Sequence, residues 1–413
     1  MGHAELVAVA SSTAQHPTGS RPAFTAVQNK VGALLPRIRA LARTTEQDRR
    51  VSAETFAALR DTGMFKLMQP ARFGGYEYGF GEFVEMNRTL GTACGSTAWC
   101  GALGMVHQWL LALFADQAQH DVWDTNPDAT CAVSYAPSGS LKAVAGGYRV
   151  SGRWSWLSNV DNADWIMLGA LLPSGTGGAP QAGFILVPKG DYQIIDDWFS
   201  VGLQGTGSKS IEIAAETLVP EHRTLTFKDA GSGAAPGTVL NRNLHYRIPF
   251  LAAVPLCLAT PTLGIVEGAL NEFVDWIGAR VTRGAVVAGG NRMAEFPQVQ
   301  SRIAEAAAAI DAAHLLVKRD VQELEDCLAR GEPINVAMRI RNRRDHAYCA
   351  KMGAQAASAL FEAVGGGGLN LESSVQRAWR DTHAIARHIS LNWDAVSTMY
   401  GQFRFGLEPK GQY

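Results

Sequence analysis

The segment YRVSGRWSWLSN (148–159) alternates large apolar residues with polar ones. Side chains on a β-strand point to opposite faces in turn, so this two-residue period predicts a half-buried strand. Similar short runs occur at 184–187 and at Ile211/Ile213, each bounded by Gly, Pro, Ser or Asn. We therefore expect residues 129–230 to form a compact β domain.

The segments on both sides of this region have a helical period. Before it, apolar residues recur at helical spacing over 24–41, a second helix follows the N-cap candidate Ser52, and 83–114 is rich in small and apolar residues. After it, two stripes indicate long amphipathic helices of a bundle; they comprise Val299, Ile303, Ala306, Ala307, Ile310, Ala313 and Val317, and Val375, Ala378, Trp379, Ile385 and Ile389.

Helices, then strands, then helices predict an α+β fold with segregated elements. The expected domains are a flexible arm (1–22), an N-terminal helical domain (23–128), a β domain (129–238) and a C-terminal four-helix-bundle domain (239–413). The stretch DAGSGAAPGT (229–238) predicts a flexible connection.

Composition excludes several classes of protein. The 413 residues contain 37 Lys and Arg against 38 Asp and Glu, which disfavours binding to nucleic acid. Six cysteines without a C-x-x-C pair indicate neither a disulfide framework nor a metal site, and fit a cytoplasmic protein. The uncharged segment 248–266 contains three prolines, so we expect a buried core helix and no membrane span. There is no G-x-G-x-x-G fingerprint for a nicotinamide cofactor.

Five motifs in order resemble those of the acyl-CoA dehydrogenase superfamily over nearly the whole chain. They are LRDTGMFKLMQPARFGGYEYGF (59–80), SYAPSGS (134–140), WSWLSN (154–159), GLQGTGS (202–208) and VGGGGLN…QRAWRD (364–381). Within that superfamily, VHQWLLALF (106–114) and WRDTHAIARH (379–388) resemble the oxygenase component of two-component flavin-dependent monooxygenases. Many dehydrogenases carry a catalytic glutamate eight residues after the Arg-Asp pair; here that position is Ile389, with His388 beside it.

The resemblance implies a reduced-flavin-dependent monooxygenase. Reduced flavin (FADH2 or FMNH2) and O2 would form a flavin C4a-hydroperoxide that hydroxylates a phenolic, indole-like or polycyclic aromatic substrate. A separate NAD(P)H:flavin reductase would supply the reduced flavin, and the oxygenase would be a homotetramer. Three alternatives stay open: an acyl-CoA dehydrogenase with a displaced base, an amino-sugar N-oxygenase, and a non-catalytic flavin-binding subunit.

The resemblance also assigns candidate residues around the flavin ring. Ser158 would place its hydroxyl near flavin N5, and Trp156 would pack on the ring; the alternative is that both are ordinary strand residues. His388, expected on a helix about 60° from Ile385, would bond the distal peroxide oxygen or act as an acid or base. The alternative for His388 is a buried histidine with a structural role.

Other candidates concern the substrate and the flavin phosphates. His107 and Ser134 would face the substrate, although His107 lies in an apolar run and could equally be a core histidine. Arg280 or Arg283 would meet a flavin phosphate. The glycine run at Gly365, Gly366 and Gly367 would let bare backbone approach the diphosphate, or would simply form a helix C-cap and turn.

Overall fold

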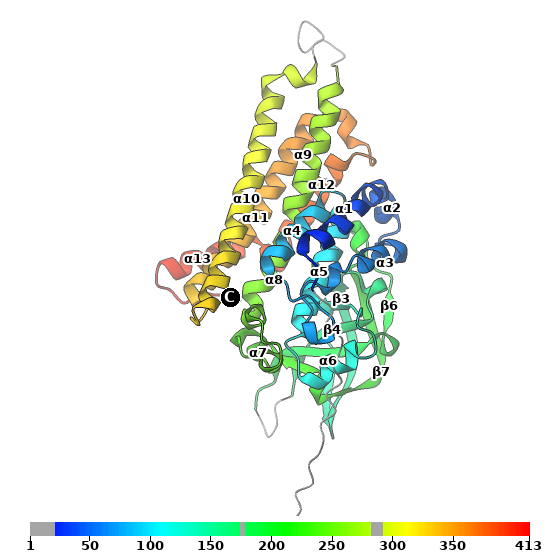
Figure 1. Cartoon of the computed structure of the whole chain (residues 1–413), viewed down its shortest axis with the longest axis vertical. Coiled ribbons are helices and arrows are strands. Elements are labelled where there is room, and N and C mark those ends of the chain that lie inside the picture. Colours follow the sequence, from blue (N-terminus) through cyan, green and yellow to red (C-terminus); the bar gives the residue numbers. More distant parts are fainter. Residues whose placement is uncertain (1–20, 174–177, 282–291) are drawn as a thin grey trace, which may run out of the picture.

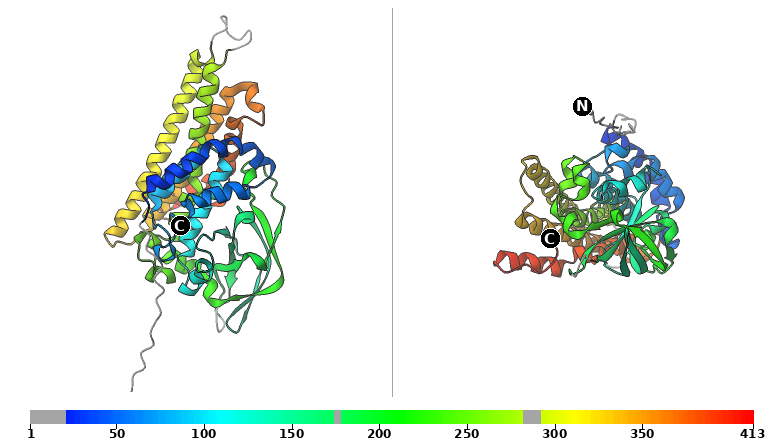
Figure 2. Two further views of the ribbon diagram at one scale, coloured as in Figure 1. Left: turned by 45° about the vertical axis from the view of Figure 1, so that its right-hand side comes forward. Right: turned by 90° about the horizontal axis from the view of Figure 1, so that it is seen from below.

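The computed structural model describes residues 21–173, 178–281 and 292–413. Arg283 and most of the N-terminal arm lie outside this range. In Figures 1 and 2 the N-terminal helices lie between two β-sheets and a set of long C-terminal helices. The predicted α+β order of helices, strands and helices is confirmed. The boundaries proposed for the three domains stay a prediction.

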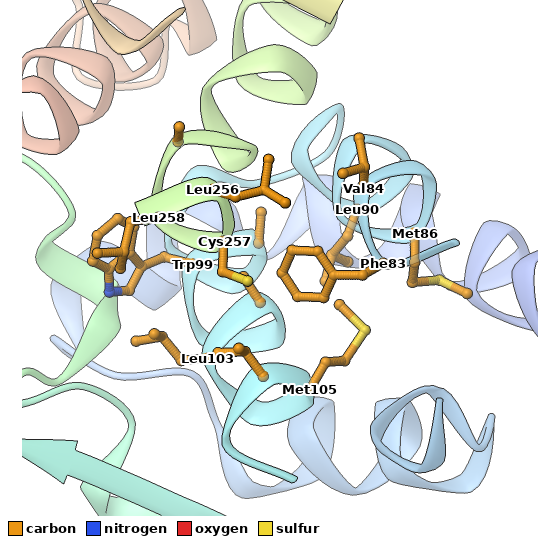
Figure 3. Close-up of a cluster of buried hydrophobic side chains, with 14 of the residues drawn as sticks. Phe83, Val84, Met86, Leu90, Trp99, Leu103, Met105, Leu256, Cys257 and Leu258 are labelled. Carbon is orange, nitrogen blue, oxygen red and sulfur yellow. The ribbon is translucent and has the colours of Figure 1, made fainter. Parts of the chain in front are cut away.

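From residue 21 onward, six α-helices precede the first strand: α1 (Phe24–Ala40), α2 (Ala42–Gln47), α3 (Ala53–Asp61), α4 (Phe80–Gly91), α5 (Gly95–Leu111) and α6 (Asp116–Trp123). Ser52 caps α3 as predicted, because its hydroxyl accepts the Thr55 backbone N–H at 3.1 Å. Helix α5 is buried along its whole length. Its Trp99, Leu103 and Met105 pack with apolar residues of α4 and with Leu256–Leu258 (Figure 3).

The predicted strands lie in two four-stranded sheets. One has the order β1-β4-β5-β8, from Cys131–Ser134, Trp165–Leu172, Gln181–Pro188 and Thr224–Thr226. The other has the order β2-β3-β7-β6, from Ser140–Val144, Gly147–Leu157, Lys209–Pro220 and Gln193–Ile195. Inward-facing residues such as Val150, Trp154 and Ile211 fill the space between the sheets. The register of β3 shifts between Trp154 and Leu157, so the strand bulges immediately before Ser158.

The C-terminal part consists of α7 (Phe227–Ser232), α8 (Phe250–Ala259), α9 (Pro261–Ala279), α10 (Pro297–Ala329), α11 (Val336–Val364), α12 (Ser374–Ala386) and α13 (Trp393–Arg404). The helical stretch Phe250–Ala279 is apolar and long enough to cross a membrane, but 89% of its most apolar window is buried inside the protein. The prediction of a buried core helix is therefore confirmed. Pro261 stands at the first position of α9, where its missing N–H costs nothing.

Two local predictions were wrong. Residues 229–238 are not a flexible connection: Thr226 caps the short helix α7, and Pro236–Val239 form a 3-10 turn. Position 237 requires glycine, because a Cβ there would lie 1.9 Å from the Ala112 carbonyl oxygen. Ile389 is also not part of the α12 stripe, because the helix ends at Ala386 and the Ile389 side chain is 84% exposed.

Candidate active site

Ser158 lies one residue beyond β3 and is almost completely buried. Its Oγ accepts the indole N–H of Trp99 at 3.0 Å and lies 2.6 Å from the Ser208 hydroxyl. The bulge gives Trp156 a positive φ of 64° and leaves its side chain 71% exposed. The ring of Trp156 is therefore exposed to solvent two residues before the buried Ser158 hydroxyl.

The turn that carries Ser208 is held from α12. The Leu203 N–H donates to Asp381 Oδ1 at 2.6 Å, and Leu203 has a positive φ of 53°. Burial raises the pKa of Asp381 to about 6. Ser208 and Asp381 lie in GLQGTGS and QRAWRD, which carried only the family resemblance, and no role was predicted for them or for Trp99. Motif membership was the single signal for Ser208 and Asp381, and Trp99, which lies outside the quoted motifs, had none.

His388 does not lie on a helix, contrary to the prediction. Helix α12 ends at Ala386, and His388 is the N-cap of a 3-10 turn, Ile389–Leu391. Its Nδ1 accepts the Ser390 backbone N–H at 3.2 Å, so the ring hydrogen of the neutral form is on Nε2. The ring centroid lies 5.8 Å from that of Trp99. Burial, with a smaller contribution from Arg343, lowers the pKa of His388 to about 4.

His107 has the opposite arrangement of its ring hydrogen. Its Nδ1 lies 2.7 Å from the Cys131 carbonyl oxygen, which can only accept, so Nδ1 carries the hydrogen. The other nitrogen, Nε2, is buried and has no hydrogen-bond partner among the described residues. Burial lowers the pKa of His107 to about 4. His107 is therefore a neutral ring with a free, buried lone pair.

Ser134 is the last residue of β1, the strand that also contains Cys131. Its hydroxyl donates to the Ser155 carbonyl at 2.9 Å and thereby joins β1 to the bulge of β3. Because its hydrogen is engaged, Ser134 can only accept a further hydrogen bond. Contacts thus join Ser134 to the bulge, Ser158 to Trp99, and Trp99 to His388. His107 lies on the helix of Trp99, eight residues further along.

Arg280 and the glycine run are brought together at a different place. Arg280, the C-cap of α9, donates from Nη1 to the Val364 carbonyl at 2.9 Å and covers the Trp276 ring at 4.8 Å. A Cβ on Gly367 would lie 3.2 Å from Trp276 and 3.7 Å from Arg280 Nη1. Figures 1 and 2 show this end of α9 at the far end of the long helices from the β-sheets. One chain therefore does not place Arg280 beside Ser158.

Comparison with known proteins agrees with this architecture. Residues 26–124 match the family model of the acyl-CoA dehydrogenase N-terminal domain, and residues 256–393 match that of the C-terminal domain. The chain is 46% identical to the FADH(2)-dependent resorcinol hydroxylase, oxygenase component, of Rhizobium sp. (strain MTP-10005), over 97% of this chain and 99% of the relative. It is 38% identical to the flavin-dependent monooxygenase oxygenase subunit HsaA of Rhodococcus jostii, over 92% and 98% of the two chains.

Solved structures agree with the same assignment. The crystal structure of 3-HSA hydroxylase from Rhodococcus sp. RHA1 superposes with a TM-score of 0.88 at 36% identity, covering 94% of this chain and 98% of that one. XiaF from Streptomyces sp., solved with FADH2 and glycerol, superposes with a TM-score of 0.84 at 25% identity, covering 94% and 97%. The chain belongs to the acyl-CoA dehydrogenase family. Within that family it is the oxygenase component of a two-component, flavin-dependent monooxygenase.

Proposed function

We propose that this oxygenase hydroxylates a small phenol, using O2 and FADH2 supplied in the cytoplasm by a separate NAD(P)H:flavin reductase. The observation that supports a phenol is the free lone pair of His107, a buried acceptor with no donor among the described residues. A buried acceptor without a partner costs free energy, which a ligand O–H recovers on binding. The 46% identity to a resorcinol hydroxylase favours a phenol over an indole, whose N–H could also bond to this nitrogen.

The residues at the β3 bulge fit a flavin ring. Trp156 offers an exposed aromatic face, and Ser158 offers a buried hydroxyl oxygen that is already bonded to Trp99 and Ser208. When bound, reduced flavin together with O2 supplies an electrophilic oxygen atom, one atom of O2 entering the substrate and the other leaving as water. The residues of this chain then have to hold the ring, exclude water and place the phenol.

His388 acts as a hydrogen-bond donor and His107 as a hydrogen-bond acceptor. His388 offers its Nε2 hydrogen to the oxygen that is being transferred, and stays neutral because its pKa is about 4. His107 accepts the phenol O–H, which raises the electron density of the ring that attacks oxygen. Ser134 accepts a second polar group of the substrate or fixes the bulge through Ser155.

The position of Arg280 supports a homotetramer in which two chains complete one flavin site. Arg280 and Gly365–Gly367 lie together at the C-terminal end of α9, which Figure 1 shows away from the sheet that contains β3. A neighbouring subunit would bring its own Arg280 and glycine run to the flavin diphosphate. Of the two arginines proposed for the phosphate contact, Arg280 is within the described residues and Arg283 is outside them. The molar mass in solution, measured by light scattering with and without FAD, tests this assembly.

The experiment that tests the function is single-turnover oxidation of chemically reduced FAD in air-saturated buffer, with a panel of substrates. We expect catechol-type or hydroquinone-type products from phenols such as resorcinol and none from their methyl ethers. Reduced FMN in a parallel series tests the choice of flavin. Oxidation of acyl-CoA thioesters, or an absence of any oxygenated product with all phenols and indoles, would contradict the proposal.

A further inference from the structure

A chain of three buried hydroxyl groups connects Ser158 to a backbone carbonyl. Ser158 Oγ lies 2.6 Å from Ser208 Oγ, which lies 2.7 Å from Thr206 Oγ1. Thr206 Oγ1 in turn donates to the Leu203 carbonyl oxygen at 2.9 Å. All three side chains are at most 8% exposed. The other end of the chain is capped by Trp99, whose indole N–H donates to Ser158 Oγ at 3.0 Å.

The two ends of this chain determine which way its hydrogens point. The Leu203 carbonyl has no hydrogen to give, so the Thr206 hydrogen points to it. Ser208 then donates to Thr206, and Ser158 donates to Ser208. In this arrangement every hydroxyl hydrogen is used inside the protein. Ser158 Oγ accepts from Trp99 and keeps one lone pair for a ligand, but no hydrogen.

The reverse arrangement makes one hydrogen bond fewer. If Ser158 turns its hydrogen toward a ligand, Ser208 must donate to Ser158. Thr206 then has one hydrogen for two acceptors, the Leu203 carbonyl and Ser208, and one of those bonds is lost. The Leu203 carbonyl also accepts from the Thr206 backbone N–H and from the Trp198 indole, so it is not left unpaired when Thr206 turns away, and the cost is at most that of the one lost hydrogen bond, about 1 kcal/mol.

We propose that Thr206 and Ser208 are positioning residues that hold Ser158 as a hydrogen-bond acceptor, so that the site selects flavin with a hydrogen on N5. Reduced flavin carries that hydrogen, whereas oxidised flavin has a bare acceptor at N5. The inference rests on the proposed place of Ser158 beside N5. One net hydrogen bond corresponds to a preference for reduced over oxidised flavin of about fivefold.

The test compares dissociation constants for reduced and oxidised FAD, measured by anaerobic titration without substrate. Thr206→Val removes the end of the chain, so Ser208 can donate to Ser158, and the reduced-to-oxidised preference should fall about fivefold. Ser208→Ala removes the acceptor of the Ser158 hydrogen and should lower the preference at least as much. Thr206→Ser keeps the hydroxyl and should keep the preference of the wild type.

Thr238→Val is the matched control. Thr238 is also buried and donates to a carbonyl three residues earlier, Ala235, at 2.7 Å, but it lies outside the hydroxyl chain. The Thr238→Val variant should keep the wild-type preference for reduced over oxidised FAD. If Thr206→Val and Ser208→Ala weaken both flavin forms by the same factor, the two residues have only a structural role and the inference fails. If the wild type binds no reduced flavin, the proposed function fails first.

Discussion

Replacing His107 with asparagine tests the roles of its two ring nitrogens separately. The asparagine Nδ2 can take the place of His107 Nδ1 and donate to the Cys131 carbonyl, which keeps the bond that the structure shows at 2.7 Å. Nothing in asparagine replaces Nε2. The variant therefore removes the buried lone pair while keeping the contact between α5 and β1. Glutamine at the same position is the matched control, because its longer side chain carries an oxygen acceptor out to where Nε2 lies.

We expect this substitution to affect phenol binding and the rate of product formation by different factors. A phenol has a pKa of about 10, and His107 has one of about 4, so full proton transfer before oxygen insertion is uphill by about 8 kcal/mol. In the substrate complex His107 therefore only accepts a hydrogen bond, and its loss should weaken phenol binding about tenfold or less. Once oxygen has added to the ring, the phenol O–H becomes a strong acid and His107 can take its proton. Losing that step should slow product formation by about a hundredfold or more.

The assay is rapid mixing of the reduced-FAD complex with oxygen and phenol, with quenched samples for product and a separate measurement of hydrogen peroxide. We expect His107→Asn to bind flavin like the wild type, consume oxygen, and release mainly hydrogen peroxide, while His107→Gln retains part of the product. The methyl ether of the substrate should bind equally to the wild type and to His107→Asn. Equal product per oxygen in the wild type and His107→Asn would refute the assignment of His107 to the phenol.

Four further predictions concern the two histidines and Asp381. His388→Ala should lower product per oxygen and raise hydrogen peroxide with little change in phenol affinity, measured with an oxygen electrode and catalase; unchanged coupling would leave His388 a structural role. Because burial lowers the pKa of His107 and of His388 to about 4, product per oxygen should stay flat from about pH 5 to 8, and an apparent pKa near 6.5 would contradict this. The unfolded state binds these protons first, so both residues should reduce stability as the pH falls from about 6.5 to about 4. Asp381→Ala leaves the buried Leu203 N–H without its acceptor and should destabilise the fold by about 1–3 kcal/mol in urea unfolding, whereas Asp381→Asn, which keeps an acceptor, should cost less.

The spacing of apolar residues, together with capping and turn residues, was sufficient to predict most helices and strands of the fold. The helix over 24–41 ends within one residue of the prediction, and Ser52 is the N-cap expected for the next helix. The same reasoning failed at His388. No glycine or proline occurs between Ala386 and Gly401, so the pattern offered no stop signal. The helix ends instead where His388 caps the next turn through its own side chain.

The hydroxyl chain could not be predicted from the sequence for a different reason. Ser158 and Ser208 are 50 residues apart, and the Leu203–Asp381 bond joins residues separated by 178. Only the pairing of β3 with β7 and the packing of α12 against the 203–208 turn bring them into contact. A single sequence contains no information on such contacts beyond the motifs in which the residues lie.

The hydrogen bonds of His388 also decide between the two chemistries that the fold supports. A dehydrogenase needs a base that removes a proton from a carbon atom, and Ile389, at the position eight residues after Asp381, cannot act as one. His388 cannot replace it, because its Nδ1 lone pair is used by the Ser390 N–H and its Nε2 carries the hydrogen. A pKa of about 4 would make it a weak base even if the ring turned over. The same ring can donate a hydrogen bond, as the role proposed for His388 in oxygen transfer requires, so the absence of the glutamate and the orientation of His388 both favour an oxygenase.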